Sequence, residues 1–411
     1  VLNKLRADPQ AKPFILARRK EVLARRGITD ADARLAEIGK IFDEAMAMPA
    51  ADFEKNQQQL AQRVVAQMQP GPAGLPPSAA PNRPAPRQTA STAPPTSANI
   101  PWIDVHVHMF PSEGSDYTRG IRDALAWMDQ APASKMIILA PPSPVHARDC
   151  EDYAVALRQH RDRFAFLGGG HSLNLLIYEA VNQTSVSVSQ RREFERKAAE
   201  ILKCGAVGFG EIGIHHLSLA LDHGYGITRP DHPLLLLLAD ISAKHDVPID
   251  VHCDLIAQDM PKPAWLTSPH NSKFFTANLP AFERFLGHNP KAKICWAHAG
   301  SDNTGHWTTE LSRRLLRTYP SLYMSLRMGP GMSGQNFPLT DDGQVKPDWL
   351  RLFQEFPNRF VIGNDMFIGK SAFHIPNPSS KRTAVFLKAL PQNLARKIAY
   401  ENAIALYKLK N

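Results

Sequence analysis

The feature that most limits the fold of this chain is a series of short apolar runs between residues 101 and 363. Each run has the length of a strand, and stretches with helical spacing, such as Arg191–Leu202, Leu234–His245 and Thr308–Thr318, lie between them. Strands that alternate with helices pair in parallel, and their nearly continuous Val, Ile, Leu and Phe content predicts burial on both faces. We count eight runs: Trp102–Val107, Met136–Ala140, Phe164–Gly168, Ala206–Gly210, Val247–Val251, Ile294–Ala297, Leu322–Ser325 and Phe360–Gly363.

Eight strand and helix repeats over roughly 300 residues match an α/β fold of the (β/α)8 type, the TIM barrel, in number and size. An open, doubly wound sheet is the alternative. It is disfavoured because polar side chains that end the first, fourth, fifth, sixth and eighth runs would not meet at one point in an open sheet. In a closed barrel all strands end on one rim, where such enzymes have their active sites. We therefore predict a barrel over residues 101–411.

Potential metal ligands end five of these runs. His106 and His108 are two residues apart on the first run, so both imidazoles point to the same side and can bind one ion. A His-X-His pair alone is weak support, since a strand with hydrogen-bonded histidines explains it as simply. The pattern gains weight because four other runs end in the same way, in Glu211, His252, His298 and Asp365. Imidazoles and carboxylates together suit one or two divalent ions, with zinc as first choice and Mn, Fe, Co or Ni as others.

The composition is that of a globular chain that can bury a large core, with 411 residues, 43% hydrophobic and 21% charged. Its apolar runs, such as Leu234–Ala239, are far shorter than the roughly 20 residues of a membrane helix. The first residues lack the apolar centre of a secretory signal, so we expect no signal peptide here, and a bacterial cytoplasmic or periplasmic location stays open. Four cysteines without paired spacing predict buried thiols, not a disulfide framework: Cys150, Cys204, Cys253 and Cys295.

The net charge of +9 raises the question of a nucleic-acid partner. Residues 1–100 hold 14 Lys and Arg against 9 Asp and Glu, and residues 101–411 hold 34 against 30. More than half of the positive excess therefore lies outside the predicted barrel. This distribution argues against a groove that follows a phosphate backbone.

Residues 1–69 are predicted to form a helical extension, with a second helix capped by Thr29 and Asp30. Apolar side chains recur along that helix with helical spacing, at Leu35, Ile38, Ile41, Phe42 and Met46. Residues 70–101 hold ten of the 34 prolines, so we predict a linker over residues 70–100. Because each helix has an apolar stripe that needs a cover, we expect a homo-oligomer that forms through these helices.

Five short motifs resemble the metal-ligand motifs of the amidohydrolase superfamily, in the style of its amidohydrolase-2 and TatD-like branches. The resemblance spans about residues 101–405. It implies a metal-dependent enzyme that acts on a small molecule. The motifs are Asp104-Val105-His106-Val107-His108, Gly210-Glu211-Ile212-Gly213, Asp250-Val251-His252, Ala297-His298-Ala299-Gly300 and Gly363-Asn364-Asp365.

The resemblance also implies roles for these residues. The more buried ion would be held by His106, His108 and Asp365, and a second ion by His252 and His298. Asp365 would also be the general base, and His298 would take part in catalysis. Glu211 would bridge two ions, as in TatD-type deoxyribonucleases and lactonase-like relatives, or would orient a ligand or substrate beside one ion, as in the decarboxylase branch.

Four more residues near the expected rim are candidates for binding the substrate. Arg327 follows the seventh run and can pair with a substrate carboxylate or form a salt bridge on the rim. His171 follows three glycines at the end of the third run, and His215 follows the motif of the fourth. Asp254, two residues after a candidate ligand, would orient that histidine or contact the substrate.

The sequence thus predicts a metal-dependent hydrolase that cleaves a carboxylic ester, lactone or amide by metal-activated hydroxide, with Asp365 as general base. Two alternatives stay open: a mononuclear-metal decarboxylase of the same fold, and a TatD-like phosphodiesterase or nuclease. A non-enzymatic scaffold is disfavoured because all five strands keep their ligand residues. The identity of the substrate is not encoded in the spacing of these motifs.

Overall fold

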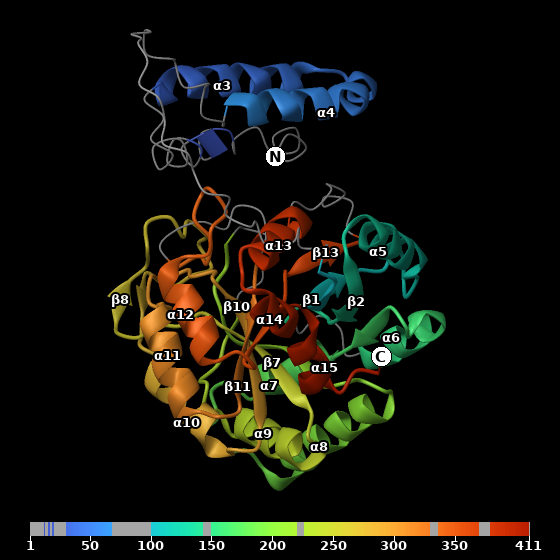
Figure 1. Cartoon of the computed structure of the whole chain (residues 1–411), viewed down its shortest axis with the longest axis vertical. Helices are drawn as coiled ribbons and strands as arrows, with labels where there is room; N and C mark the ends of the chain where they lie inside the picture. Colours follow the sequence, from blue (N-terminus) through green and yellow to red (C-terminus); the bar gives the residue numbers. More distant parts are fainter. Residues whose placement is uncertain are drawn as a thin grey trace, which may run out of the picture. The chain divides into compact units, whose positions relative to one another are not determined.

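The structure is a computed structural model that separates into two compact units, Val1–Thr92 and Ala93–Asn411 (Figure 1). Nearly all of the expected proline-rich linker, and most of residues 1–29 of the expected helical extension, including Thr29, lie outside the described residues. The boundaries of the three expected segments therefore stay predictions. The described residues are 12, 15, 16, 19, 30–67, 100–142, 149–219, 226–328, 336–369 and 379–410.

The second unit contains the predicted parallel barrel. Its strands are β1 (Trp102–Met109), β2 (Ala133–Ile138), β3 (Phe164–Phe166), β4 (Gly168–Gly169), β5 (Phe209–His216), β7 (Pro248–Cys253), β10 (Lys293–Ala299), β11 (Leu322–Leu326) and β12 (Phe360–Ile362). They neighbour one another in the order β3, β2, β1, β12, β11, β10, β7, β5, β4. Since Leu167 alone separates β3 from β4, these two are parts of one strand, and the ring of eight closes there. The eight runs and the closed topology are confirmed.

Helices cover the outside of the barrel (Figure 1). They are α5 (Thr118–Gln130), α6 (Cys150–Ala156), α7 (Ser172–Glu179), α8 (Val188–Lys203), α9 (Pro233–His245), α10 (Leu279–His288), α11 (Thr309–Thr318), α12 (Pro347–Glu355), α13 (Ser379–Lys388), α14 (Gln392–Arg396) and α15 (Asn402–Tyr407). A short 3-10 turn (Arg158–His160) and a π-helical turn (Lys397–Glu401) complete them. The three helical stretches expected from spacing correspond to α8, α9 and α11.

Local sequence explains where these helices begin. At α8 the Ser187 side chain accepts from the Gln190 amide at 3.2 Å, and the Gln190 side chain accepts from the Ser187 amide at 2.8 Å. This reciprocal cap satisfies two amides that the first helical turn leaves unpaired. At α11 the Thr308 hydroxyl accepts from the amide of Leu311. Both caps fix the register of the amphipathic face that packs on the barrel.

The barrel has an apolar layer on each side of its strands. Outside, the Trp296 ring of β10 stacks on Trp307 with 3.6 Å between centroids. Inside, aliphatic side chains such as Val105, Leu139 and Leu167 share one cluster with Tyr407 at the end of α15. The last helix therefore contributes to the packed interior, and the opposite end of the barrel is left for polar side chains.

Short strands line the ends of several barrel strands: β6 (Gly226–Ile227), β8 (Met260–Pro261), β9 (Phe274–Phe275) and β13 (Met366–Ile368). β13 continues the pairing of the eighth strand with β1, with Val107 opposite Met366. β8 pairs with β9 in a hairpin after β7. These additions lie where the candidate ligands emerge from the barrel. Among the described helices, no segment is long and apolar enough to cross a membrane.

The first unit holds α3 (Ala31–Ala47) and α4 (Ala50–Gln67). Asp30 occupies the N-cap position of α3 but pairs with Arg34 at 2.8 Å instead of accepting a capping bond. Ile38 and Phe42 of α3 are fully buried in a cluster shared with Phe53 of α4. The apolar stripe is thus largely covered within its own unit, which removes the main reason for expecting these helices to join two chains. An oligomer stays a prediction.

Candidate metal centre

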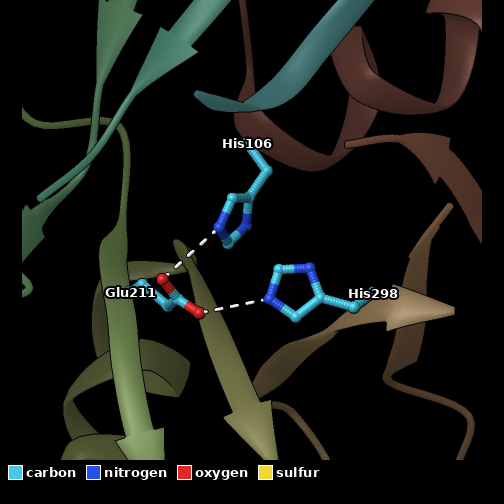
Figure 2. Close-up of side chains that lie close together, drawn as sticks. All are labelled: His106, Glu211 and His298. Carbon is cyan, nitrogen blue, oxygen red and sulfur yellow. Dashed lines mark hydrogen bonds and ion pairs between the residues drawn. The ribbon is translucent and has the colours of Figure 1, made fainter. Parts of the chain in front are cut away.

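Six side chains predicted as ligands meet at one end of the barrel. They come from β1, β5, β7, β10 and the turn between β12 and β13. Figure 2 shows three of them, His106, Glu211 and His298, with one carboxylate oxygen of Glu211 directed at each imidazole. These four strands and the turn span residues 102–365 of the sequence, and the closed ring brings them together.

One carboxylate oxygen of Glu211 faces the ligands of β1. Its Oε2 lies 3.4 Å from Nε2 of His106 and 3.3 Å from Nε2 of His108. The Oδ1 atom of Asp365 lies 3.2 Å from the same His108 nitrogen and 3.9 Å from the His106 nitrogen. Two imidazoles and two carboxylates therefore point their donor atoms at a common space. We call His106, His108 and Asp365 the β1 group.

The other oxygen of Glu211 faces a second set of ligands. Its Oε1 lies 2.8 Å from Nδ1 of His252 and 3.3 Å from Nε2 of His298. These two nitrogens are 3.0 Å apart. We call His252 and His298 the β7–β10 group, and it adjoins the β1 group, because the rings of His298 and His106 lie 4.7 Å apart.

The backbone turns sharply at two of the ligands. His298 has a φ of 71° and Asp365 a φ of 55°, both in the left-handed region. This conformation costs a residue other than glycine about 1–3 kcal/mol, and such residues cluster at functional sites. The turn at Asp365 is held by its amide, which donates to the carbonyl oxygen of His106 at 3.0 Å. It aims the carboxylate at the β1 histidines.

Three of the histidines have an acceptor near their second ring nitrogen, and at His108 and His252 the contact is a hydrogen bond. Nδ1 of His106 lies 3.2 Å from Asp250, Nδ1 of His108 lies 3.0 Å from the carbonyl oxygen of Leu139, and Nε2 of His252 lies 3.2 Å from Asp254. An acceptor on the far nitrogen fixes the tautomer and leaves the near nitrogen free to bind a cation. Asp250 was not singled out from the sequence, although it belongs to the quoted motif of the fifth strand.

Two buried amide side chains support the backbone around the ligands, and Asn174 could not be recognised as one of them from the sequence. The Asn174 side chain donates to the carbonyl oxygen of Glu211 at 2.8 Å and accepts from the amide of Gly213 at 3.1 Å. Asn364 donates to the buried carboxylate of Asp104 through its amide and its side chain, at 3.0 and 2.8 Å. Asn174 thus fixes β5, and Asn364 fixes β1 against the turn before β13.

The charges of the site oppose the effect of burial. Burial alone would raise the pKa of Glu211, but the neighbouring histidines, His106 first, outweigh it and hold that pKa well below its usual range. Burial would also raise the pKa of Asp365, and the Arg327 guanidinium reverses this, so its pKa too lies well below the usual range. Burial lowers the pKa of His298 to about 4. Both carboxylates are therefore ionised, and His298 offers a neutral imidazole.

The four predicted substrate residues differ in position. Arg327 pairs with Oδ2 of Asp365 at 2.9 Å, so it contacts the expected general base. Asp254 holds His252 and also accepts from the amide of Leu217 at 2.8 Å, which makes it an orienting residue in this structure. His171 precedes α7 and is half-buried.

His215 is buried, with Nδ1 2.6 Å from the side-chain nitrogen of Asn278. Its neighbour His216 is the one that packs against a candidate ligand, with its ring 4.3 Å from that of His252. The pairing of β5 with β7 shifts register between Gly213 and His215, so simple alternation from Glu211 no longer tells which histidine faces the site.

The donor atoms fit a metal ion. Nε2 of His106 is buried and has no hydrogen-bond partner among the described residues, although it points at two carboxylates. Donor atoms bound to one tetrahedral zinc ion at about 2.0–2.1 Å stand roughly 3.3–3.4 Å apart. Three separations within the β1 group or from it to Glu211, 3.4, 3.3 and 3.2 Å, are close to that value. Two sets in this site have ligand atoms close enough to share an ion: His106 with Glu211 and His298, and His106 with His108 and Asp365.

Comparison with known families agrees with this geometry. The model of the amidohydrolase family Amidohydro_2 matches residues 103–409. The chain belongs to the amidohydrolase family. It is therefore a metal-dependent enzyme of the hydrolase or lyase type that acts on a small molecule. The resemblance stated from the motifs is confirmed, and the match begins in β1 and ends after α15.

Solved structures with related folds are distant from this chain. A structural-genomics amidohydrolase II shares 16% identity over 75% of this chain and 99% of its own, with a TM-score of 0.44. Amidohydrolase 2 from Bifidobacterium longum subsp. infantis shares 12% identity over 76% and 100%, with a TM-score of 0.39. A Xaa-Pro dipeptidase with bound methionine shares 12% over 75% of each chain, with a TM-score of 0.40. No curated protein matched the sequence.

Proposed function

We propose that this amidohydrolase is a binuclear metal-dependent hydrolase that cleaves a carboxylic ester, a lactone or an amide. The β1 group would hold the more buried ion, the β7–β10 group would hold the second, and Glu211 would bridge them. Zinc is the first candidate for both positions, because it prefers imidazole and carboxylate ligands, and Mn, Fe, Co or Ni are the others.

The observation that carries the proposal is the division of the Glu211 carboxylate. Oε2 is within 3.4 Å of both β1 histidines, and Oε1 is within 3.3 Å of both histidines of the other group. A carboxylate that only oriented one ligand would need one oxygen for that contact. Here each oxygen has its own pair of imidazoles, as a bridge between two ions requires.

Electrostatics give a reason for this arrangement. Two unit charges about 4 Å apart repel by about 4 kcal/mol at an effective dielectric constant of about 20, so two dications repel by about 16 kcal/mol. The ionised Glu211 between them and Asp365 beside the first ion would offset most of that repulsion. Both carboxylates keep low pKa values in this site, so they are charged before an ion binds.

The bound metal would lower the pKa of a water molecule to about 7 and polarise the substrate carbonyl. Asp365 would accept the proton of that water at the barrel mouth, where its Oδ1 faces His108 and its Oδ2 faces Arg327. Arg327 would hold the Asp365 carboxylate in place while the proton moves. Asp254, Asp250 and the carbonyl oxygen of Leu139 would keep the histidines in the correct tautomers.

The reaction class is tested with metal-loaded protein and a substrate panel. Lactones, aryl esters and amides should be turned over, and a chelator should abolish that turnover until metal is restored. An oligonucleotide and a simple phosphodiester serve as the nuclease comparison, and release of CO2 from aromatic acids as the decarboxylase comparison. Cleavage of phosphodiesters alone would contradict the proposal and indicate a nuclease. Loss of CO2 without hydrolysis would contradict it and indicate a decarboxylase.

A further inference from the structure

Two of the four cysteines, 54 residues apart in sequence, lie side by side in the barrel wall. Sγ of Cys150 is 2.8 Å from Sγ of Cys204. Cys150 is the first residue of α6, and Cys204 caps the C-terminus of α8. The spacing of the cysteines predicted buried thiols, and the structure has four free thiols, of which Cys204 is partly exposed. The contact between Cys150 and Cys204 could not be predicted from spacing, because the fold joins two distant helix ends.

We propose that Cys150 and Cys204 are a site of thiol–disulfide exchange, which closes into an intramolecular disulfide and thereby restrains the segment that supports Glu211. A disulfide requires its sulfurs to be about 2.05 Å apart, so the two atoms need to approach by less than about 1 Å. This is within the reach of small side-chain rotations. Cys253 and Cys295 are buried free thiols and provide internal controls.

The two cysteines differ in their exposure to solvent, and this difference determines which thiol reacts first. Cys204 is partly exposed and Cys150 is buried, and burial raises the pKa of the Cys150 thiol. A small-molecule disulfide such as oxidised glutathione would therefore meet Cys204 first. The Cys204 thiolate attacks one sulfur of the reagent, the reagent's S–S bond breaks, and one thiol leaves with a proton from water.

Cys150 then completes the exchange. Its thiol gives its proton to water, and its sulfur attacks Sγ of Cys204, which expels the second half of the reagent as a thiol. In total the two protein thiols lose two protons and two electrons, and the reagent is reduced to two thiols. No metal or other cofactor enters this balance.

Hydrogen bonds connect this cysteine pair with the metal centre. Asp149, the residue before the pair's first cysteine, accepts from the amide of Gly169 at 2.6 Å and from that of His171 at 3.1 Å. These residues lead directly into α7, which carries Asn174. Asn174 in turn binds the carbonyl oxygen of Glu211. A disulfide between α6 and α8 would therefore restrain the segment that carries Asn174. Asn174 holds the backbone of Glu211, the proposed bridging residue.

Binding of a metal ion is the alternative to disulfide formation at the two cysteines. Sγ of Cys150, Sγ of Cys204 and a carboxylate oxygen of Glu151 lie close enough together to bind one. Such an ion needs deprotonated thiols, and burial works against this at Cys150. The two thiols also touch each other with no space between them for an ion. Disulfide formation is the chemistry that this spacing favours.

The test uses the full chain, first reduced and then incubated with reduced or oxidised glutathione in excess, with or without zinc. After alkylation of the unfolded protein, mass spectrometry should find one disulfide between Cys150 and Cys204 in the oxidised sample only. Cys253 and Cys295 should carry the alkylating reagent in both samples. Amide hydrogen exchange of residues 168–175 should be slower in the oxidised protein.

Matched variants complete the design. Cys204→Ser and Cys150→Ser should each remove the crosslink and the difference in hydrogen exchange, and either one that folds is sufficient. Four alkylated thiols under oxidation, a lasting glutathione adduct on Cys204, or protection of both thiols by zinc without a crosslink would overturn the proposal. So would a crosslink that leaves hydrogen exchange unchanged. None of these readouts depends on the proposed hydrolysis.

Discussion

The two ligand groups on either side of Glu211 differ in how firmly the protein holds them. The histidines of the β1 group are buried, with side-chain exposures of 0% and 2%, and their far nitrogens face Asp250 and a backbone carbonyl. In the β7–β10 group, His252 is 12% exposed and is oriented by Asp254. Nδ1 of His298 and Nδ1 of His106 both have no hydrogen-bond partner among the described residues, but only the His106 nitrogen has a carboxylate, Asp250, at 3.2 Å.

If each group holds an ion, as we propose, this difference gives the two ions different tasks. The β1 group is pre-organised by buried partners, which favours tight and lasting binding of an ion. The β7–β10 group is nearer to solvent and has fewer fixed partners, which suits an ion that meets the substrate and exchanges more readily. A titration with a chelator should therefore remove metal in two phases, the first from the β7–β10 side.

The largest expected effect on activity comes from the replacement of Asp365. Replacement by Asn keeps the shape of the side chain and removes the proton acceptor, so kcat/KM for the best substrate of the panel should fall by roughly 10²–10⁴ fold. The control is Asp302→Asn, which changes a carboxylate that accepts from the amide of Thr304 at 3.0 Å and should cost much less activity. Equal losses in the two variants would show that Asp365 has no special role.

A matched pair of substitutions compares the two groups directly. Asp250→Asn removes the carboxylate beside His106, and Asp254→Asn removes the one beside His252. Each should weaken metal binding by about 10–100 fold. Asp250→Asn should affect the ion that leaves last in a chelator titration, and Asp254→Asn the ion that leaves first. Identical titration curves for the two variants would mean that the two groups act as one.

A smaller effect is expected at Arg327, which contacts Asp365 from the side opposite His108. Arg327→Lys keeps the positive charge and loses the planar pair of donors, so we expect kcat/KM to fall about tenfold. If Arg327 holds the base, kcat falls and KM stays nearly constant. If it binds a carboxylate of the substrate instead, KM rises and kcat is kept, and a substrate without that carboxylate shows no difference.

The sequence was sufficient for the six candidate ligands because each of them ends an apolar strand, and strand ends of a barrel meet at one rim. Their supports were harder to find. Asn174 reaches Glu211 across 37 residues, and nothing in its own neighbourhood marks it as polar support for another strand. Of the two histidines that end β5, His215 was chosen from the sequence, whereas the register shift before it brings His216 to the ring of His252.

In the helical extension, too, the sequence predicted a helix but not the residues that pack against it. One of the extension's helices was predicted from the spacing of residues such as Ile38 and Phe42, and the structure contains it as α3. What covers the stripe could not be read from spacing, since a stripe can pack on its own unit, on the barrel or on another chain. Among the described residues α3 and α4 cover each other.

The most direct test of the two-group site is the metal content of the purified chain, measured by mass spectrometry after equilibrium dialysis against zinc. The account predicts two ions per chain in the wild type, and one or fewer in Glu211→Ala, because the proposed bridge and its negative charge are lost. Glu193→Ala, which removes an exposed carboxylate of α8 that pairs with Arg196, should keep two ions at the same zinc concentration. One ion in the wild type and one in Glu211→Ala would contradict the binuclear centre.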